Sequence, residues 1–155
     1  AEIAKARGDY TMARTLGLTN LLATPGNTDC LQTPRASMQT YLAGAVGGDA
    51  AARAKALAVI DECLATKPVV VPTWTIFGLH HFGQATRVLQ VVEQGPTTDD
   101  AGLFIYFWNP QGRAARQLPE FPAFARRIGF AELWNKYGPP DDCRKNAADN
   151  YVCSQ

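Results

Sequence analysis

Two adjacent histidines, His80 and His81, are the residues of this sequence that most readily suggest metal chemistry. Neighbouring residues of a helix point about 100° apart. The two rings therefore do not converge on one metal ion, and helical ligand pairs are spaced i, i+4 instead. His81 shares a helical face with Trp74 and Phe77. We expect His81 to be a hydrogen-bonded histidine of the core or of an interface, and we predict no metal site.

Paired carboxylates occur at Asp99-Asp100 and at Asp141-Asp142. General acid–base catalysis requires such groups to face an opposing group across a cleft. The first pair precedes an apolar helix and is typical of capping residues, whereas the second follows two prolines in a polar tail. No serine or cysteine has a histidine at the spacing of a known nucleophilic motif. We predict no catalytic residue, no enzymatic activity and no cofactor.

The four cysteines are Cys30, Cys63, Cys143 and Cys153, and they allow three pairings. None forms a C-x-x-C motif, which disfavours zinc binding and thioredoxin-like chemistry. A bond between Cys143 and Cys153 would close a small polar loop, contribute roughly 2–3 kcal/mol by the chain-entropy estimate, and leave Cys30 for Cys63. The alternative is four free thiols. Paired cysteines would indicate a periplasmic or secreted protein, and free thiols a cytoplasmic one.

Composition excludes several classes of partner. The 155 residues include 15 basic and 14 acidic side chains, and like charges occur in blocks of at most two. Clustered Lys and Arg are usual on nucleic-acid-binding domains, so we predict no nucleic-acid binding. No apolar run approaches the roughly 18 residues of a membrane span. The sequence begins with alanine, inside a pattern typical of a helix, and we expect it to be a piece of a longer protein.

Helical periodicity interrupted by glycine predicts the elements that position these residues. Asp9 and Asp49 precede two helices and are expected to cap them. The expected helices cover about 10–23, 34–46, 50–67, 73–82 and 85–94, and one more follows capping residues at 97–100 and ends at Trp108. Residues 24–30 are expected to form a loop, and the three valines at 69–71 an extended linker.

Apolar residues at helical spacing predict which side of each helix is buried. The inward residues expected from this pattern are Met12, Ala13, Leu16 and Leu21; Met38, Tyr41, Leu42 and Ala45; Ala54, Leu57, Val59, Ile60 and Leu64; and Trp74, Ile76, Phe77, Leu79 and Phe82.

Turns at Gly8, Gly48 and Gly83 recur at spacings of 40 and 35 residues. Paired helices at such a period indicate a helical repeat, in which each hairpin buries its apolar face against its neighbours. No strand pattern of useful length is present. We predict a single all-α domain with repeats over about 1–30, 33–67, 72–95 and 98–118, a cap over 119–143 and a tail over 144–155.

Nine of the fifteen aromatic residues lie between positions 104 and 137, which predicts the densest part of the core there. Two short amphipathic helices joined at Gly129 are expected. The first carries a stripe of Phe121, Phe124 and Ile128, and the second a face of Phe130, Leu133, Trp134 and Tyr137. Arg126 and Arg127 lie opposite the first stripe. They are expected to form a solvated face, with contact to an acidic partner segment as the alternative.

The segments FWNP (107–110) and RQLPEFPAFARRIGFAELWNKYGPPDDC (116–143) resemble the carboxyl end of a group of bacterial proteins. Those proteins carry tetratricopeptide-like repeats behind a winged-helix DNA-binding domain or an adenylate cyclase domain. The sequence departs from their pattern at Phe130, where leucine is usual. The segment GDYTMA (8–13) also looks like the turn of a tetratricopeptide hairpin. The matching residues are Arg116, Pro119, Phe121, Ile128, Gly129, Trp134, Pro140, Asp141 and Cys143. The resemblance implies a right-handed α-α superhelix closed by a capping carboxyl-terminal segment.

The hypothesis that follows is a non-catalytic interaction scaffold or regulatory module of a larger signalling or transcription-regulating protein. Its partner would be a protein or peptide segment held in a groove. The residues expected to contact the partner are Gln39, Tyr41, His80, Tyr106, Arg126 and Arg127. The alternative is an extracytoplasmic small-molecule sensor domain of a membrane-tethered regulator, with a pocket beside Trp74 and His81.

Overall fold

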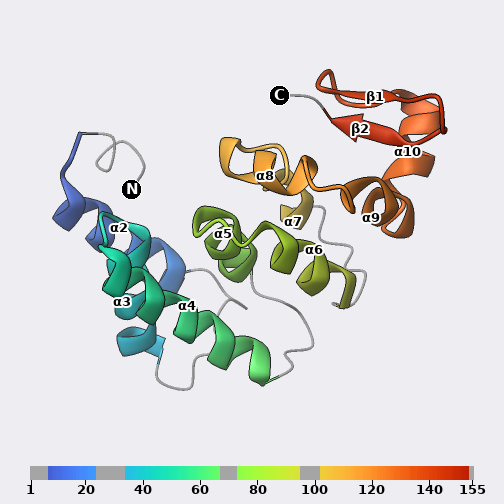
Figure 1. The fold of residues 1–155 in the computed structure, drawn as a ribbon. Coiled ribbons are helices and arrows are strands. Elements are labelled where there is room, and N and C mark those ends of the chain that lie inside the picture. The colour runs from blue at the N-terminus through green and yellow to red at the C-terminus, as the bar shows by residue number, and fades with distance from the viewer. Residues whose placement is uncertain (1–6, 24–33, 67–72, 95–101, 154–155) are drawn as a thin grey trace. The chain divides into compact units, whose positions relative to one another are not determined.

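A computed structural model describes residues 7–23, 34–66, 73–94 and 102–153 (Figure 1). The predicted loop at 24–30, the linker at 69–71, the capping residues at 97–100 and Cys30 lie outside these ranges. The chain divides into two compact units, Ala1–Phe82 and Gly83–Gln155.

The first unit is built around a helical hairpin formed by α3 and α4, which pack along each other (Figure 1). A Cβ atom on Gly44 would lie 2.5 Å from the Cβ atom of Ala56, so the two helices approach at a distance that only glycine permits. Gly47, with φ of +69°, closes the turn between them. The helices of this unit are α2 (Tyr10–Ala23), α3 (Pro34–Ala45), α4 (Ala50–Ala65) and α5 (Thr73–His81).

Both predicted helix caps are confirmed. The Asp49 carboxylate accepts a hydrogen bond from the backbone N–H of Ala52 at 2.8 Å. The Asp9 carboxylate accepts one from the backbone N–H of Met12 at 3.0 Å. Each cap satisfies a backbone donor that the first turn of a helix leaves without an internal partner.

The buried stripes of this unit agree with the prediction on α3 but not throughout α4. All four residues predicted on α3 are buried. On α4, Ala54 is exposed, and Leu57 and Leu64 are half-buried. The buried residues of α4 repeat at i, i+3, i+4 and i+7. They are Ala56, Val59, Ile60 and Cys63. Ala54 lies two positions before the first of them and therefore points to the opposite side of the helix.

The prediction for α2 is wrong for Met12 and Leu16, whereas the side chain of Leu21 lies outside the described part of the chain. Ala13 is buried, but Met12 and Leu16 are 54% and 42% exposed. On this helix Arg14 donates hydrogen bonds to the Val46 carbonyl at 3.1 and 2.8 Å. Arg14 therefore connects α2 to the residue that follows α3, and Met12 and Leu16 remain partly in solvent.

The second unit combines short helices with a small sheet. Helix α6 lies against α8 and α9, and α9 lies against α10 and β2. The elements are α6 (Ala85–Gln94), α7 (Gly102–Ile105), the 3-10 helix η1 (Pro110–Gly112), α8 (Arg113–Arg116), α9 (Phe121–Arg127), α10 (Phe130–Tyr137), β1 (Cys143–Lys145) and β2 (Tyr151–Cys153).

The predicted aromatic core is confirmed in this unit. Phe107, Phe121 and Phe124 are fully buried, and the ring centroids of Phe107 and Phe124 are 5.3 Å apart. The predicted pair of helices around Gly129 is also confirmed. Gly129 adopts φ of +87°, a conformation that glycine reaches without strain, and it separates α9 from α10.

Only part of the face predicted on α10 is buried. Phe130 and Trp134 are buried, whereas Leu133 and Tyr137 are 50% and 71% exposed. The rings of Trp108 and Tyr151 contact the buried pair, with centroid separations between 5 and 6.5 Å. The surrounding structure thus covers one i, i+4 row of this short helix and leaves the adjacent row in solvent.

The helix predicted to end at Trp108 ends at Ile105. The backbone N–H groups of Phe107 and Trp108 bond to carbonyls three residues earlier, at 3.1 Å each, which marks a tight turn. Asn109 is extended, with φ of −72° and ψ of 159°. The proline that follows it disfavours helical geometry at this position.

The tail predicted over 144–155 contains structure that the sequence did not reveal. β1 and β2 form an antiparallel pair in the register Cys143↔Cys153, Arg144↔Val152 and Lys145↔Tyr151. Strands of three residues are too short to show a clear alternation of apolar and polar residues. The prediction of no strand is therefore wrong for this hairpin, and the described residues form no other strand.

The division between the units falls within the predicted third repeat, because α5 ends in the first unit and α6 begins in the second. A repeat of helical hairpins and its superhelical hand stay predictions. Within the described ranges, no helix is both long enough and apolar enough to cross a membrane.

Candidate functional site

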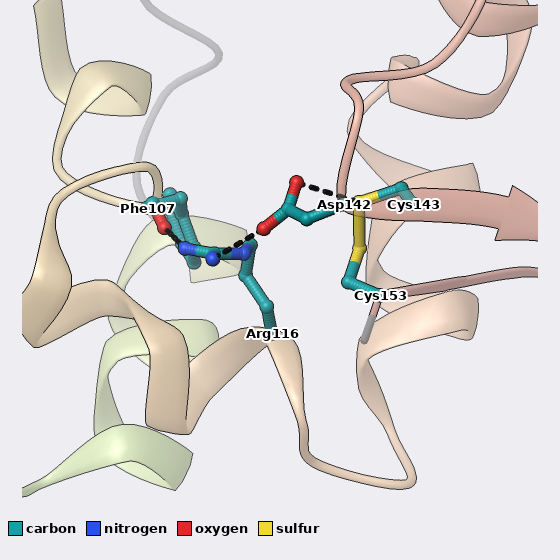
Figure 2. The surroundings of a disulfide bond; sticks show 5 residues. All are labelled: Phe107, Arg116, Asp142, Cys143 and Cys153. Carbon is teal, nitrogen blue, oxygen red and sulfur yellow. Dashed lines mark hydrogen bonds and ion pairs between the residues drawn. A yellow bond between two sulfur atoms is a disulfide. The ribbon is translucent and has the colours of Figure 1, made fainter. Parts of the chain in front are cut away.

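Arg116, the last residue of α8, is the centre of the polar contacts in the second unit. Its side chain is 7% exposed, and its Nη2 lies 2.5 Å from Oδ2 of Asp142. Its Nη1 donates a hydrogen bond to the backbone carbonyl of Phe107. Figure 2 shows the guanidinium between these two acceptors. A buried arginine requires such partners because an unpaired charge is costly to remove from water.

The Arg116 guanidinium also lies over the Trp108 ring, 5.9 Å from its centroid. Arg116 therefore contacts Phe107 and Trp108 in the turn after α7. It also contacts Asp142 in the segment that precedes β1. A planar guanidinium suits this position because it can stack on a ring and donate several hydrogen bonds at once. Arg116 thereby fixes the end of α8 relative to the hairpin.

The hairpin is closed by the predicted disulfide between Cys143 and Cys153 (Figure 2). The alternative of four free thiols is therefore wrong, and none of the described cysteines is free. Asp142 directly precedes Cys143, and its Oδ1 lies 3.7 Å from the Cys143 sulfur. The ion pair with Arg116 and the disulfide between the strands therefore involve adjacent residues, Asp142 and Cys143. The predicted pairing of Cys30 with Cys63 includes a residue outside the described ranges and stays a prediction.

Side-chain contacts hold the other end of the hairpin. Tyr151 is buried, its ring lies 5.1 Å from that of Trp134, and its hydroxyl donates to Oδ1 of Asn135 at 3.0 Å. In the turn, the Lys145 ammonium lies 2.8 Å from the Asp149 carboxylate. The hydrogen bond to Asp149 raises the pKa of Lys145 above its ordinary value.

The turn residue Asn146 organises the loop between the strands. Its Oδ1 accepts hydrogen bonds from the backbone N–H groups of Ala148 and Asn150, both at 3.0 Å. Asp149 adopts φ of +60°, a conformation that aspartate and asparagine tolerate better than most residues. The loop is therefore shaped by its own side chains, as an Asx turn is.

A groove of about 400 Å³ lies between this hairpin and the α8–α9 segment. One wall is formed by the end of α8, the connection and the start of α9, and the other by the hairpin turn and β2. Among the lining residues the charged side chains are Arg116 and Arg126. The complete lining is Arg116, Gln117, Leu118, Pro119, Pro122, Ala123, Arg126, Asn146, Asn150, Val152 and Cys153.

The two arginines at the end of α9 have different environments. Arg127 donates to Oε1 of Glu93 on α6, with its Nε at 2.8 Å and its Nη2 in contact with the same oxygen. Arg126 is exposed and lines the groove. The groove can therefore offer an accessible positive charge, amide groups and apolar surface to a ligand, which is chemistry suited to binding.

The sequence-predicted binding residues divide between the two units. In the first, Gln39 is exposed on α3, whereas Tyr41 and His80 are 2% and 5% exposed. The Tyr41 hydroxyl donates to the Trp74 carbonyl at 3.1 Å. In the second, Tyr106 is half-buried after α7, and Arg126 lines the groove. Arg126 is thus the one predicted binding residue among those that form this groove, and the binding roles of the others stay predictions.

The face of α5 where a small-molecule pocket was the alternative is closely packed. A Cβ atom on Gly78 would lie 2.7 Å from the Tyr41 ring and 2.8 Å from Cδ1 of Ile60. On the same helix, His81 stacks on Phe77, with 5.9 Å between ring centroids and 17° between the planes. His81 is half-buried, and the hydrogen bond expected of it stays a prediction.

Sequence reasoning missed the hairpin wall of the groove and the roles of Arg116 and Asp142. Arg116 did belong to the motif on which the family resemblance depends, but no pattern connected it with a carboxylate 26 positions later. In the sequence, Asp142 follows two prolines in a polar segment, and only the path of the backbone brings it to Arg116.

Comparison with known protein families, with characterised proteins and with solved structures finds no match to this chain.

Proposed function

We propose that this chain is a non-catalytic protein-interaction module of a larger signalling or transcription-regulating protein, and that the groove between α8–α9 and the hairpin holds a peptide segment of its partner. The groove is the observation that carries this proposal. Its volume of about 400 Å³ lies near the lower end of the roughly 300–1,000 Å³ typical of small-molecule sites, so the groove has room for a few side chains of a peptide.

The way the groove is held supports a binding role. Its α8 wall ends in Arg116, which is paired with Asp142, and its hairpin wall is closed by the Cys143–Cys153 bond. A site whose walls are held before the ligand arrives loses less conformational freedom on binding. Two short elements that would be mobile alone can therefore present a defined surface to a flexible peptide.

Other features support the remaining parts of the proposal. The close α3–α4 hairpin, with its glycine at the helix contact, is compatible with a tetratricopeptide-like repeat. The Cys143–Cys153 disulfide favours a periplasmic location, because such bonds persist in oxidising compartments. The sensor alternative receives less support, because the face of α5 near Gly78 has no room for even a methyl group.

Peptide selection followed by mapping tests the proposal. A random peptide library would be selected against the disulfide-intact chain, and the selected peptides tested on two variants, Ala123→Trp and Ala114→Trp. Ala123 lines the groove, whereas Ala114 is an exposed residue of α8 outside the lining. We expect binding to fall at least about tenfold with A123W, because the indole fills the groove, and to be unchanged with A114W. Equal binding to both variants would place the interaction elsewhere.

A further inference from the structure

We infer that the groove recognises an acidic peptide segment, in which an Asp or Glu side chain pairs with Arg126 and neighbouring apolar residues contact the rest of the lining. This inference rests on the proposed function and specifies the chemistry of its partner. It begins from the charges that surround the groove.

The charged residues of the lining are both arginines, and they have different partners. Arg116 is almost fully buried, and Asp142 neutralises it. Arg126 lines the same groove from α9 and is exposed. The ion pairs among the described residues involve Arg116, Arg127 and Lys145, and not Arg126. A positive potential therefore remains at Arg126. It favours a ligand of the opposite sign.

The environment of Arg127 shows why Arg126 is the arginine available to bind a ligand. Arg127 is held by Glu93 of α6. Successive residues of a helix point about 100° apart, so Arg127 faces α6 while Arg126 faces the groove. Of two neighbouring residues with the same charge, one is occupied within the unit and the other can bind a ligand.

The remaining lining suits a peptide better than a free inorganic anion. Leu118, Pro119, Pro122 and Ala123 provide apolar surface on the same wall as Arg126. On the hairpin wall, Val152 adds apolar surface, and Asn146 and Asn150 provide amide groups. A small anion would use the charge alone. An Asp or Glu flanked by apolar residues would use both the charge and the apolar surface, and arginine can bind a carboxylate through two parallel hydrogen bonds.

Fluorescence anisotropy with defined probes tests the inference on the full, disulfide-intact chain. The probes are three fluorescein-labelled peptides of equal length in which leucine alternates with glutamate, glutamine or lysine. We expect the glutamate peptide to bind about fivefold more tightly than the glutamine peptide, and the lysine peptide to bind most weakly. We also expect the preference for glutamate to decrease as salt rises from about 0.05 to 0.5 M, because exposed ion pairs are screened.

Arg126→Gln and Arg127→Gln are a matched pair of variants for this test. Both side chains are exposed, so neither change should unfold the chain. R126Q should remove the preference for glutamate over glutamine, whereas R127Q should retain it. Equal binding of the glutamate and glutamine peptides to the unmodified chain, or an equal loss with R127Q, would overturn the inference.

The test separates failure of the inference from failure of the proposed function. If the glutamine peptide binds as well as the glutamate peptide, and A123W weakens both, the groove binds peptides without using charge. The inference is then wrong and the proposed function stands. If no peptide binds at concentrations up to about 1 mM, the range of weak recognition, and library selection also yields none, both are wrong.

Discussion

The α3–α4 hairpin and the α9–α10–β1–β2 region bury their cores by different means. In the first unit, two regular helices approach through Gly44 and Ala56, whose small size permits the close contact. In the second, short helices and a three-residue hairpin surround a cluster of aromatic rings. An ion pair and a disulfide also connect parts of the second unit.

The groove lies in the second unit, between short elements joined by turns. Neither of its walls is a long element, and the buried Arg116 and the disulfide hold them. Substitutions in both units test this contrast, beginning with the most destabilising.

Truncating the aromatic core should have the largest effect. Phe124 is fully buried against Phe107 and Phe121, so Phe124→Ala should lower the free energy of unfolding of the second unit by about 4 kcal/mol. Guanidinium unfolding monitored by tryptophan fluorescence measures this in a Trp74→Phe background, where both remaining tryptophans belong to the second unit. Leu133→Ala, at a half-exposed residue, is the control and should cost less than about 1 kcal/mol.

Removing the buried guanidinium should be nearly as severe. Arg116→Ala leaves the Phe107 carbonyl and the Asp142 carboxylate without their partner. Loss of one member of a buried ion pair costs about 3–5 kcal/mol. We expect about 3 kcal/mol here because the Asp142 side chain is 29% exposed and regains water. The same unfolding assay measures it, and a loss below about 1 kcal/mol would show that Arg116 does not hold the groove wall.

Opening the hairpin should affect both stability and binding. The double variant Cys143→Ser, Cys153→Ser should lose roughly 2–3 kcal/mol, because the unfolded chain is no longer restrained by the cross-link. Peptides that bind the groove should also bind more weakly, since the wall containing Val152 becomes less ordered. Chemical denaturation and fluorescence anisotropy measure the two effects. Unchanged peptide affinity would mean that the hairpin wall does not contribute to binding.

In the first unit, Gly44→Ala tests the close helix contact. The added methyl group would lie 2.5 Å from the Cβ atom of Ala56 and 2.6 Å from the Ala52 carbonyl oxygen. Overpacking of this kind costs about 1–3 kcal/mol, and the higher helix propensity of alanine recovers about 1 kcal/mol. We expect a net loss of about 1 kcal/mol by circular dichroism melting. Lys55→Ala, at an exposed residue of α4, should be nearly neutral, and a stabilised G44A would disprove the contact.

The smallest effect concerns the hairpin turn and its pH dependence. The hydrogen bond to Asp149 raises the pKa of Lys145, so this pair contributes stability below the ordinary lysine pKa and loses it as pH rises through the raised value. Asp149→Asn keeps a residue that tolerates φ of +60° but removes the charge. An NMR titration of the Lys145 side chain should then give a pKa closer to its ordinary value. An unchanged pKa would show that Asp149 is not its cause.

Local patterns predicted most of the helices. The caps at Asp9 and Asp49, the hinge at Gly129 and the boundaries of α6 depend on neighbours within one or two turns, and a sequence displays these directly. Exposure was harder to predict. Met12 and Leu133 have the same apolar character as buried residues, and which row of a short helix is covered depends on what lies across from it.

The helical character and the aromatic cluster after position 104 can be predicted from sequence alone, and the spacing of Cys143 and Cys153 offers a disulfide as one of two alternatives. The contact between Arg116 and Asp142, the strand pairing and the groove beside Arg126 depend on the folded backbone. These features differ in the sequence separation of the residues that interact. Helix formation depends on interactions between residues a few positions apart. An ion pair across 26 positions exists only because the whole intervening backbone folds along one path.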